Sequence, residues 1–271
     1  MPLQRSRLLP VSPSCLFFNG VNQYAVVGLR PDGSGAPFTV YGWSEITVEH
    51  KLYLVWPKPS TTYAVTGMIG SPWENYPSMS LYTSSPQNYS EWYIDFVART
   101  SGGTRADYVY RVVGNWNTWL HVVQRFTSSR EVSFFINATR VYGATVPSDY
   151  TTILEQNPDA TPYPERYKRF VLGVDSKLAW FLSVRHSYLR IYRRALTDEE
   201  ILWNFYYPDN PVRNGLVLWL HWDSIDTATG VWYDKSGFGN HATLYNNPVK
   251  EDVLLPPKRV LSPTRTLSPT R

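Results

Sequence analysis

The chain has 271 residues, of which 43% are hydrophobic, 18% charged and 15% aromatic, and it carries a formal net charge of +4. This length allows one large all-β or α/β domain or two small ones, and the many aromatic residues exclude an average disordered chain. A net charge this small gives no argument for a nucleic-acid-binding protein. The single cysteine, Cys15, excludes an intramolecular disulfide framework and any Cys-rich metal site.

The first residues do not resemble a targeting segment. Residues 1–14 are proline-rich and polar, so we predict an arm. Pro10 and Pro13 interrupt its apolar stretch, which makes it a poor signal peptide. No apolar run of the chain approaches the ~20 residues of a transmembrane helix, so we expect no transmembrane segment.

The middle of the chain has the pattern of a β protein. From Leu16 to about Arg194, short alternating or apolar runs are separated by clusters of Pro, Gly, Asn and Ser. Many strands at this spacing predict a two-sheet antiparallel β-sandwich, or jelly roll. The segment 156–167 holds three prolines and predicts a long surface loop.

One short helix is predicted near 197–206. Thr197 and Glu200 have the spacing of a capping box, in which each side chain accepts a hydrogen bond from the other residue's backbone. Leu196 and Ile201 are placed to form a hydrophobic staple. We expect the apolar stripe to continue through Leu202, Trp203 and Phe205 until Pro208.

After the helix and further strands, residues 250–271 are rich in Pro, Ser, Thr and Arg. They contain the direct repeat Leu-Ser-Pro-Thr-Arg at 261–265 and 267–271. Such a composition buries too little apolar surface to fold alone. We therefore predict an arm at 1–14, one sandwich at 15–249 and a C-terminal tail at 250–271.

Three segments carry a family resemblance. They are Leu-Phe-Phe-Asn-Gly-Val-Asn-Gln-Tyr at 16–24, Trp-Asn-Thr-Trp-Leu-His-Val-Val at 116–123 with the strand 132–137, and Leu-Arg-Ile-Tyr-Arg-Arg-Ala-Leu-Thr-Asp-Glu-Glu-Ile at 189–201. In this order they resemble the laminin-G-like branch of the concanavalin A-like lectin/glucanase superfamily. The resemblance covers residues 16–205 and implies two curved antiparallel sheets. Members bind glycans or proteins, and a minority of the superfamily hydrolyses polysaccharides.

A fourth match is out of order. Residues 215–220 and the Gly-rich stretch 234–244 resemble the strand and loop that open the family's domain, yet here they come last. We expect a circular permutation in which 215–244 complete the chain's own sandwich. The alternative is insertion into a neighbouring copy, which would make a homo-oligomer.

Calcium is the usual ion of the resembled family, and it needs several hard oxygens. Asn19, Asn22 and Gln23 stand where the family usually has Asp, and neutral amides offer no charge to offset dehydration of the ion. Asp234 and Asn240 remain as candidate metal ligands, although the Gly-rich loop explains both without a metal. We therefore expect no cofactor, with calcium as the alternative.

We find no catalytic pair. The superfamily's glucanases carry Glu-x-Asp-x-x-Glu on one strand, and this string is absent. Glu91 and Asp95 lie four residues apart on one strand face, about 13 Å apart at ~3.3 Å per residue. Glycoside hydrolysis needs two carboxylates at most ~9.5 Å apart. The five histidines show no ligand spacing, so we predict a non-enzyme.

Aromatic residues supply the strongest binding signal. Their faces stack on the C–H faces of sugars and also anchor protein interfaces. They cluster in residues 56–93, where core or sheet-surface packing is the alternative for each. The candidate ligand-binding residues are Trp56, Trp73, Tyr76, Tyr82, Tyr89 and Trp92, and Tyr93 belongs to the same cluster.

A second cluster is basic. Arg185, Arg190, Arg193 and Arg194 predict a solvated face, with a basic stripe for an acidic glycan, a membrane or a partner as the alternative.

These observations favour a non-catalytic carbohydrate- or protein-binding module that serves adhesion or assembly. The expected partners are glycans or other protein subunits, and the expected setting is a virion or an extracellular surface. The alternatives are a polysaccharide hydrolase or lyase of the same superfamily and an intracellular lectin.

Overall fold

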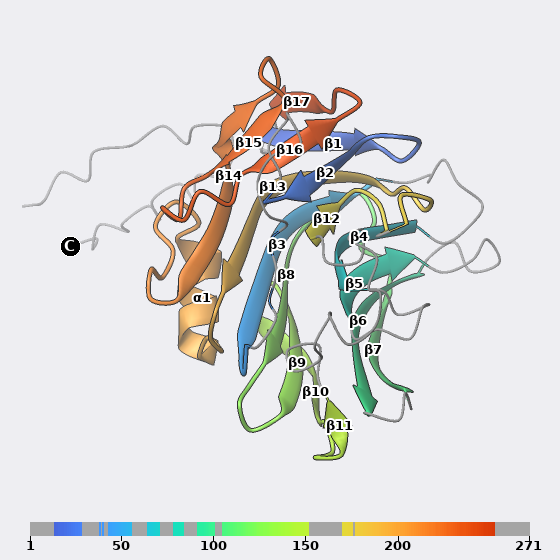
Figure 1. Cartoon of the computed structure of the whole chain (residues 1–271), viewed down its shortest axis with the longest axis vertical. Coiled ribbons are helices and arrows are strands. Elements are labelled where there is room, and N and C mark those ends of the chain that lie inside the picture. The colour runs from blue at the N-terminus through green and yellow to red at the C-terminus, as the bar shows by residue number, and fades with distance from the viewer. Residues whose placement is uncertain are drawn as a thin grey trace, which may run out of the picture.

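The computed structural model describes residues 14–28, 38, 40, 43–55, 64–70, 78–83, 91–100, 105–151, 170–175 and 177–252. Within these residues the chain forms antiparallel β-strands and a single α-helix (Figure 1). The predicted all-β sandwich with one short helix is therefore confirmed. The predicted loop 156–167 and most of the arm and tail lie outside the described residues.

The centre of the larger sheet, sheet A, is β3, which pairs with β8 on one side and with β13 on the other. Beyond β8 follow β9 and β10. The edge of β13 opposite β3 pairs with two strands. Residues 183–186 pair with β1, and residues 188–192 pair with β14. The bounds are β1 (Ser14–Asn19), β3 (Ile46–Leu54), β8 (Trp119–Phe126), β9 (Glu131–Ile136), β10 (Thr139–Thr145), β13 (Ser183–Tyr192) and β14 (Leu216–Asp226).

From β14 the ladder continues through β15 and β16 to β2 and β12, and β17 pairs with β1. The strand at 215–220 therefore packs within its own chain, beside β13. The bounds are β2 (Tyr24–Val27), β12 (Phe170–Leu172), β15 (Val231–Asp234), β16 (Ala242–Tyr245) and β17 (Val249–Asp252). Within the described residues, sheet A extends from Ser14 to Asp252, which lies beyond the predicted start of the tail.

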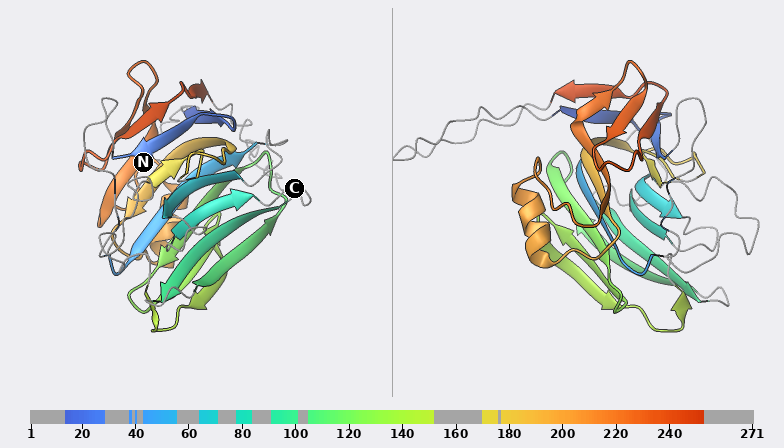
Figure 2. Two further views of the ribbon diagram at one scale, coloured as in Figure 1. Left: turned by 45° about the vertical axis from the view of Figure 1, so that its right-hand side comes forward. Right: turned by 60° about the vertical axis from the view of Figure 1, so that its left-hand side comes forward.

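The smaller sheet, sheet B, lies across the core from sheet A (Figure 2). Its strands run in the order β4–β5–β6–β7, with β11 at one end of β6, and β4 also touches β12. The bounds are β4 (Ala64–Gly70), β5 (Ser78–Thr83), β6 (Glu91–Thr100), β7 (Arg105–Val113) and β11 (Tyr150–Thr151).

The main core fills the space between the sheets. Successive side chains of a strand point to opposite faces, so β6 buries Trp92, Ile94, Phe96 and Ala98 in this core and turns the residues between them outward. Gln124 of β8 is a polar side chain buried in this mostly apolar core. Its amide donates to the backbone oxygens of Ser80 and Asp95 at 3.3 and 2.9 Å, which joins sheet A to β5 and β6.

The helix α1 (Asp198–Tyr206) lies on the outer face of sheet A, away from sheet B (Figure 1). Both bonds of the predicted capping box are present, from Glu200 N to Thr197 Oγ1 at 3.2 Å and from Thr197 N to Glu200 Oε2 at 2.9 Å. Leu196 and Ile201 are buried as expected. The expected burial of Leu202 and Trp203 is wrong, because both side chains face solvent.

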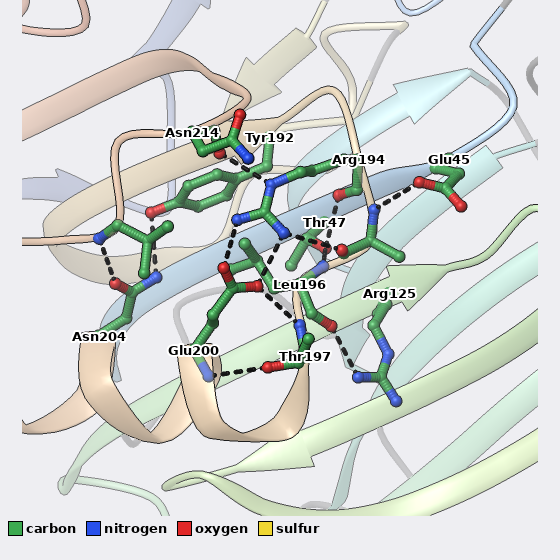
Figure 3. Close-up of polar contacts among 12 residues, drawn as sticks. Glu45, Thr47, Arg125, Tyr192, Arg194, Leu196, Thr197, Glu200, Asn204 and Asn214 are labelled. Atoms are coloured by element: carbon green, nitrogen blue, oxygen red, sulfur yellow. Dashed lines mark hydrogen bonds and ion pairs between the residues drawn. The ribbon is translucent and has the colours of Figure 1, made fainter.

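Ion pairs hold the start of α1 to the sheet (Figure 3). Arg194 donates to both carboxylate oxygens of Glu200, at 2.7 and 2.6 Å. Arg125 of β8 donates to the Leu196 carbonyl at 2.8 Å and to Asp198 at 2.6 Å. These bonds fix the first turn of the helix on the sheet.

A buried ion pair lies beneath α1. Glu49 of β3 and Arg190 of β13 are fully buried, and their Oε2 and Nη1 atoms are 3.2 Å apart. Asn204 of α1 donates to both carboxylate oxygens of Glu49 at 3.1 Å, and its own oxygen accepts from Val212 N at 2.8 Å. Burial alone would raise the pKa of Glu49, but His121, Arg190 and Asn204 hold it below its usual range.

The predicted solvated arginine face is largely wrong. Arg190 is buried against Glu49, and Arg194 is paired with Glu200. Arg185 lies over the rings of Phe17 and Tyr53 and bonds Glu251 at 2.5 Å. These guanidinium groups are used inside the fold, which also removes the alternative of a free basic stripe.

Three histidines are fully buried in sheet A: His50, His121 and His186. Burial lowers the pKa of His186 to about 3. Burial also lowers the pKa of His50 well below its usual range, and the nearby His186 lowers it further. Burial also lowers the pKa of His121, although Glu49 opposes this. The His50 ring nitrogens have no hydrogen-bond partner among the described residues. All three histidines therefore favour their neutral form in the folded protein.

We expect Arg190→Met to destabilise the fold by about 3–5 kcal/mol, because it leaves the Glu49 carboxylate buried without its cation. The double variant Glu49→Gln/Arg190→Met should recover a large part of this loss, since no buried charge is left unpaired. Urea unfolding of the three proteins measures both effects. A loss below about 1 kcal/mol in the single variant would contradict this account.

We expect stability to fall as the pH falls from about 6.5 toward 3. A histidine with a lowered folded pKa takes up its proton in the unfolded chain first, so its contribution is complete above the unfolded pKa and is lost below it. His50→Leu should flatten the dependence by up to about 1.4 kcal/mol per pH unit. Urea titrations at several pH values measure the slope, and equal slopes in both proteins would disprove the role of His50.

Candidate functional site

The outer face of sheet B carries the candidate site. Cross-strand pairing places Tyr82 of β5 opposite Tyr93 of β6, and Tyr93 opposite Arg111 of β7. The next row along the same face pairs Ser80 with Asp95. Because these residues alternate with the core residues, one short stretch of sequence builds both the interior and this surface.

Tyr82 and Tyr93 form the aromatic part of the site. Their ring centroids are 4.9 Å apart with an interplanar angle of 13°, so the rings are stacked. Both side chains are half-buried. The pair offers a rigid aromatic surface with hydroxyl groups at its edge, the amphipathic character common in binding surfaces.

Glu91 and Arg111 form the charged part. Glu91 Oε2 accepts from the Tyr93 hydroxyl at 2.8 Å, and Glu91 Oε1 accepts from Arg111 Nη2. The hydrogen bond from Tyr93, followed by the contacts with Arg111, lowers the pKa of Glu91. Glu91 is buried while Arg111 is 59% exposed. The arrangement keeps the carboxylate ionised and presents the guanidinium to solvent.

The hydroxyl groups of Ser78 and Ser80 lie on this face beyond the tyrosines. Both are buried and have no hydrogen-bond partner among the residues that the structure describes. Most buried polar side-chain atoms bond a protein group or an ordered water molecule. The face therefore combines stacked rings with an exposed cation, whereas its two serine hydroxyls are enclosed.

The expected role of Trp92 is wrong. Its side chain points to the inner face of β6 and is 1% exposed, and its Nε1 donates to the Gly114 carbonyl at 3.3 Å. The ring packs in the main core and has no face for a surface ligand. Of the other candidates, only Tyr82 is described; Trp56, Trp73, Tyr76 and Tyr89 lie outside the described residues and stay predictions.

Two members of the site, Glu91 and Arg111, were not predicted as binding residues from the sequence. Glu91 was considered only as a catalytic acid, although its spacing of two from Tyr93 places both on one strand face. Arg111 was not considered, because nothing in its own segment indicates a partner twenty residues away. Only the register of β6 against β7 brings it to the carboxylate.

The two candidate metal ligands are used by their own loop. Asp234 accepts from the backbone of Trp219, Ser236 and Asn240 at 2.8, 2.8 and 3.0 Å, and from the Ser236 hydroxyl at 2.7 Å. The Asn240 amide donates to the Val217 carbonyl at 2.8 Å. Four N–H and O–H donors point at the oxygens that calcium would need, so these residues do not fit the ion.

The described part of the chain contains no group of three or more His, Cys, Asp or Glu that could hold a metal ion. Glu91 and Asp95 lie four residues apart on one face of β6, and Glu91 is already paired with Arg111.

Among the described residues, no helix has the length and apolar character needed to span a membrane.

No protein-family model matches the sequence, and no curated protein sequence matches it significantly. The fold resembles that of a protein from Bacteroides ovatus ATCC 8483 to which carbohydrate binding is ascribed, with a TM-score of 0.56 and 16% identity over 89% of this chain. The matched region covers 60% of the Bacteroides chain. A weaker likeness, with a TM-score of 0.47, 11% identity and coverage of 72% of this chain and 42% of the other, links it to the botulinum neurotoxin serotype D binding domain. At 16% identity, the likeness to the Bacteroides ovatus protein shows a shared β-sandwich fold alone.

Proposed function

We propose that this chain is a non-catalytic carbohydrate-binding β-sandwich, and that the outer face of sheet B is its binding site. The observation that carries the proposal is the stacked pair Tyr82–Tyr93 beside Glu91 and Arg111. Aromatic faces pack on the C–H faces of sugar rings, while charged and hydroxyl groups at their edge bond sugar hydroxyls. The ascribed carbohydrate binding of the Bacteroides ovatus protein agrees with this choice.

The site favours a neutral sugar over an anionic one. The charge of Arg111 is already balanced by Glu91, so the pair can donate and accept hydrogen bonds without a net charge. Binding should not need calcium, because the Glu91 carboxylate is already bonded by Tyr93 and Arg111.

The wider role belongs to the same proposal. A sandwich that binds glycans or other subunits suits adhesion or assembly on a virion or an extracellular surface. We also propose that the chain is a circular permutation of the laminin-G-like domain. The support is that β14, β15 and β16, whose sequence resembles the family's opening segment, lie between β13 and β2 of the same chain.

We expect Tyr82→Ala and Tyr93→Ala each to weaken binding of the best neutral glycan on an array by about tenfold or more, because truncating a central aromatic contact costs at least ~1.4 kcal/mol. The matched control is Tyr233→Ala, an exposed tyrosine of β15 on sheet A. It should leave binding unchanged, as should a calcium chelator.

Binding that survives both tyrosine variants would place the site elsewhere. Absence of any glycan ligand would leave protein binding as the function. Release of reducing sugar from the bound polysaccharide would instead favour the hydrolase alternative.

A further inference from the structure

The exposed side of α1 is unusually apolar for a helix at the surface. Leu202 and Trp203 are each 45% exposed, and Tyr206 and Tyr207 are 65% and 51% exposed. Trp203 and Tyr207 are one helical turn apart, and their ring centroids are 4.2 Å apart. Large exposed apolar patches usually mark a binding surface. We call these four residues the α1 patch.

The segment that carries the α1 patch is acidic, although the chain as a whole is basic. Residues 198–210 contain Asp198, Glu199, Glu200 and Asp209 and no Lys or Arg. Asp198 and Glu200 are paired with Arg125 and Arg194. Glu199 is exposed without an ion pair to any described residue, and the Asp209 side chain is 72% exposed, with His221 as its neighbour. These two carboxylates are therefore available to a cationic partner.

Residues 253–271 have the complementary chemistry. They contain Lys258, Arg259, Arg265 and Arg271 and no acidic residue. Pro256, Pro257, Pro263 and Pro269 favour a polyproline II conformation. Proline-rich segments of this kind dock on surfaces lined by aromatic residues, because the preformed extended chain loses little entropy on binding.

The chain leaves the fold close to α1. Asp252, the last residue of β17, pairs with Ser14, and the Ser14 hydroxyl bonds the Trp222 carbonyl at 3.0 Å. Trp222 follows His221, whose Nε2 is 3.3 Å from Asp209 Oδ1, just beyond the end of α1. Nineteen residues span up to about 59 Å at ~3.1 Å per residue, whereas a domain of this size has a radius of gyration of only about 18 Å.

We propose that residues 253–271 dock on the α1 patch of their own molecule, with prolines against Trp203, Tyr206 and Tyr207 and with arginine or lysine beside Glu199 and Asp209. Intramolecular docking is favoured because the short connection from Asp252 gives a high effective concentration. The two Leu-Ser-Pro-Thr-Arg repeats supply two equivalent segments for this contact. This inference does not rest on the proposed glycan site.

Contact can be measured in the full chain with a bimane fluorophore on Thr264→Cys, because a nearby tryptophan quenches bimane. The native Cys15 does not interfere: it is buried, and burial together with the charge of Glu251 raises the pKa of its thiol to about 12. We expect Tyr206→Ser and the pair Glu199→Lys/Asp209→Lys each to raise the emission at least about twofold by releasing a mostly docked segment. These variants keep Trp203, so a rise reports loss of docking.

The matched control is Trp119→Leu, a half-buried tryptophan on the outer face of β8, which should leave the emission unchanged. Salt should raise the emission in the wild-type background, because the paired charges are exposed. Emission that does not respond to the α1 variants would overturn the proposal. Quenching that weakens on dilution would also overturn it, since the partner would then be a second copy.

Discussion

The fold is organised around the buried carboxylate of Glu49. An ionised group without water costs several kcal/mol unless other groups neutralise and bond it, so Glu49 needs both Arg190 and Asn204. Arg190 joins β3 to β13 at the centre of sheet A. Asn204 brings α1 onto the same point and also bonds Val212 in the connection to β14. One buried charge thereby sets the position of the helix and the path of the chain into the last strands.

This arrangement explains how α1 and its C-cap residue Tyr207 can together expose four large apolar side chains. Helices usually gain their stability by burying one face. Here the capping box, the Arg194–Glu200 pair and the Arg125 contacts hold the first turn (Figure 3). Ile201 and Asn204 are buried. The remaining surface is not needed for attachment, which leaves it available for another segment.

In sheet B, the strand β6 contributes to the core with one face and to the candidate site with the other. Its β6 buries Trp92 and Ile94 on one side and places Glu91 and Tyr93 on the other. Gln124 bonds the backbone of β5 and β6 from inside, so the core fixes the spacing of the strands that carry the outer tyrosines. A ligand site on this face would be preorganised by the core beneath it, which reduces the cost of ordering on binding.

The sequence by itself determined the features that depend on local signals. Alternation of apolar residues predicts the strands, and the spacing of Thr197 and Glu200 predicts where α1 begins, because both patterns act over a few residues. Alternation cannot say which face of β6 meets the core, so Trp92 was expected at the surface. The burial of Arg190 and the pairing of Arg111 with Glu91 were likewise decided only by the tertiary structure. Each needs a partner that is distant in sequence, and only strand register and helix packing bring the two together.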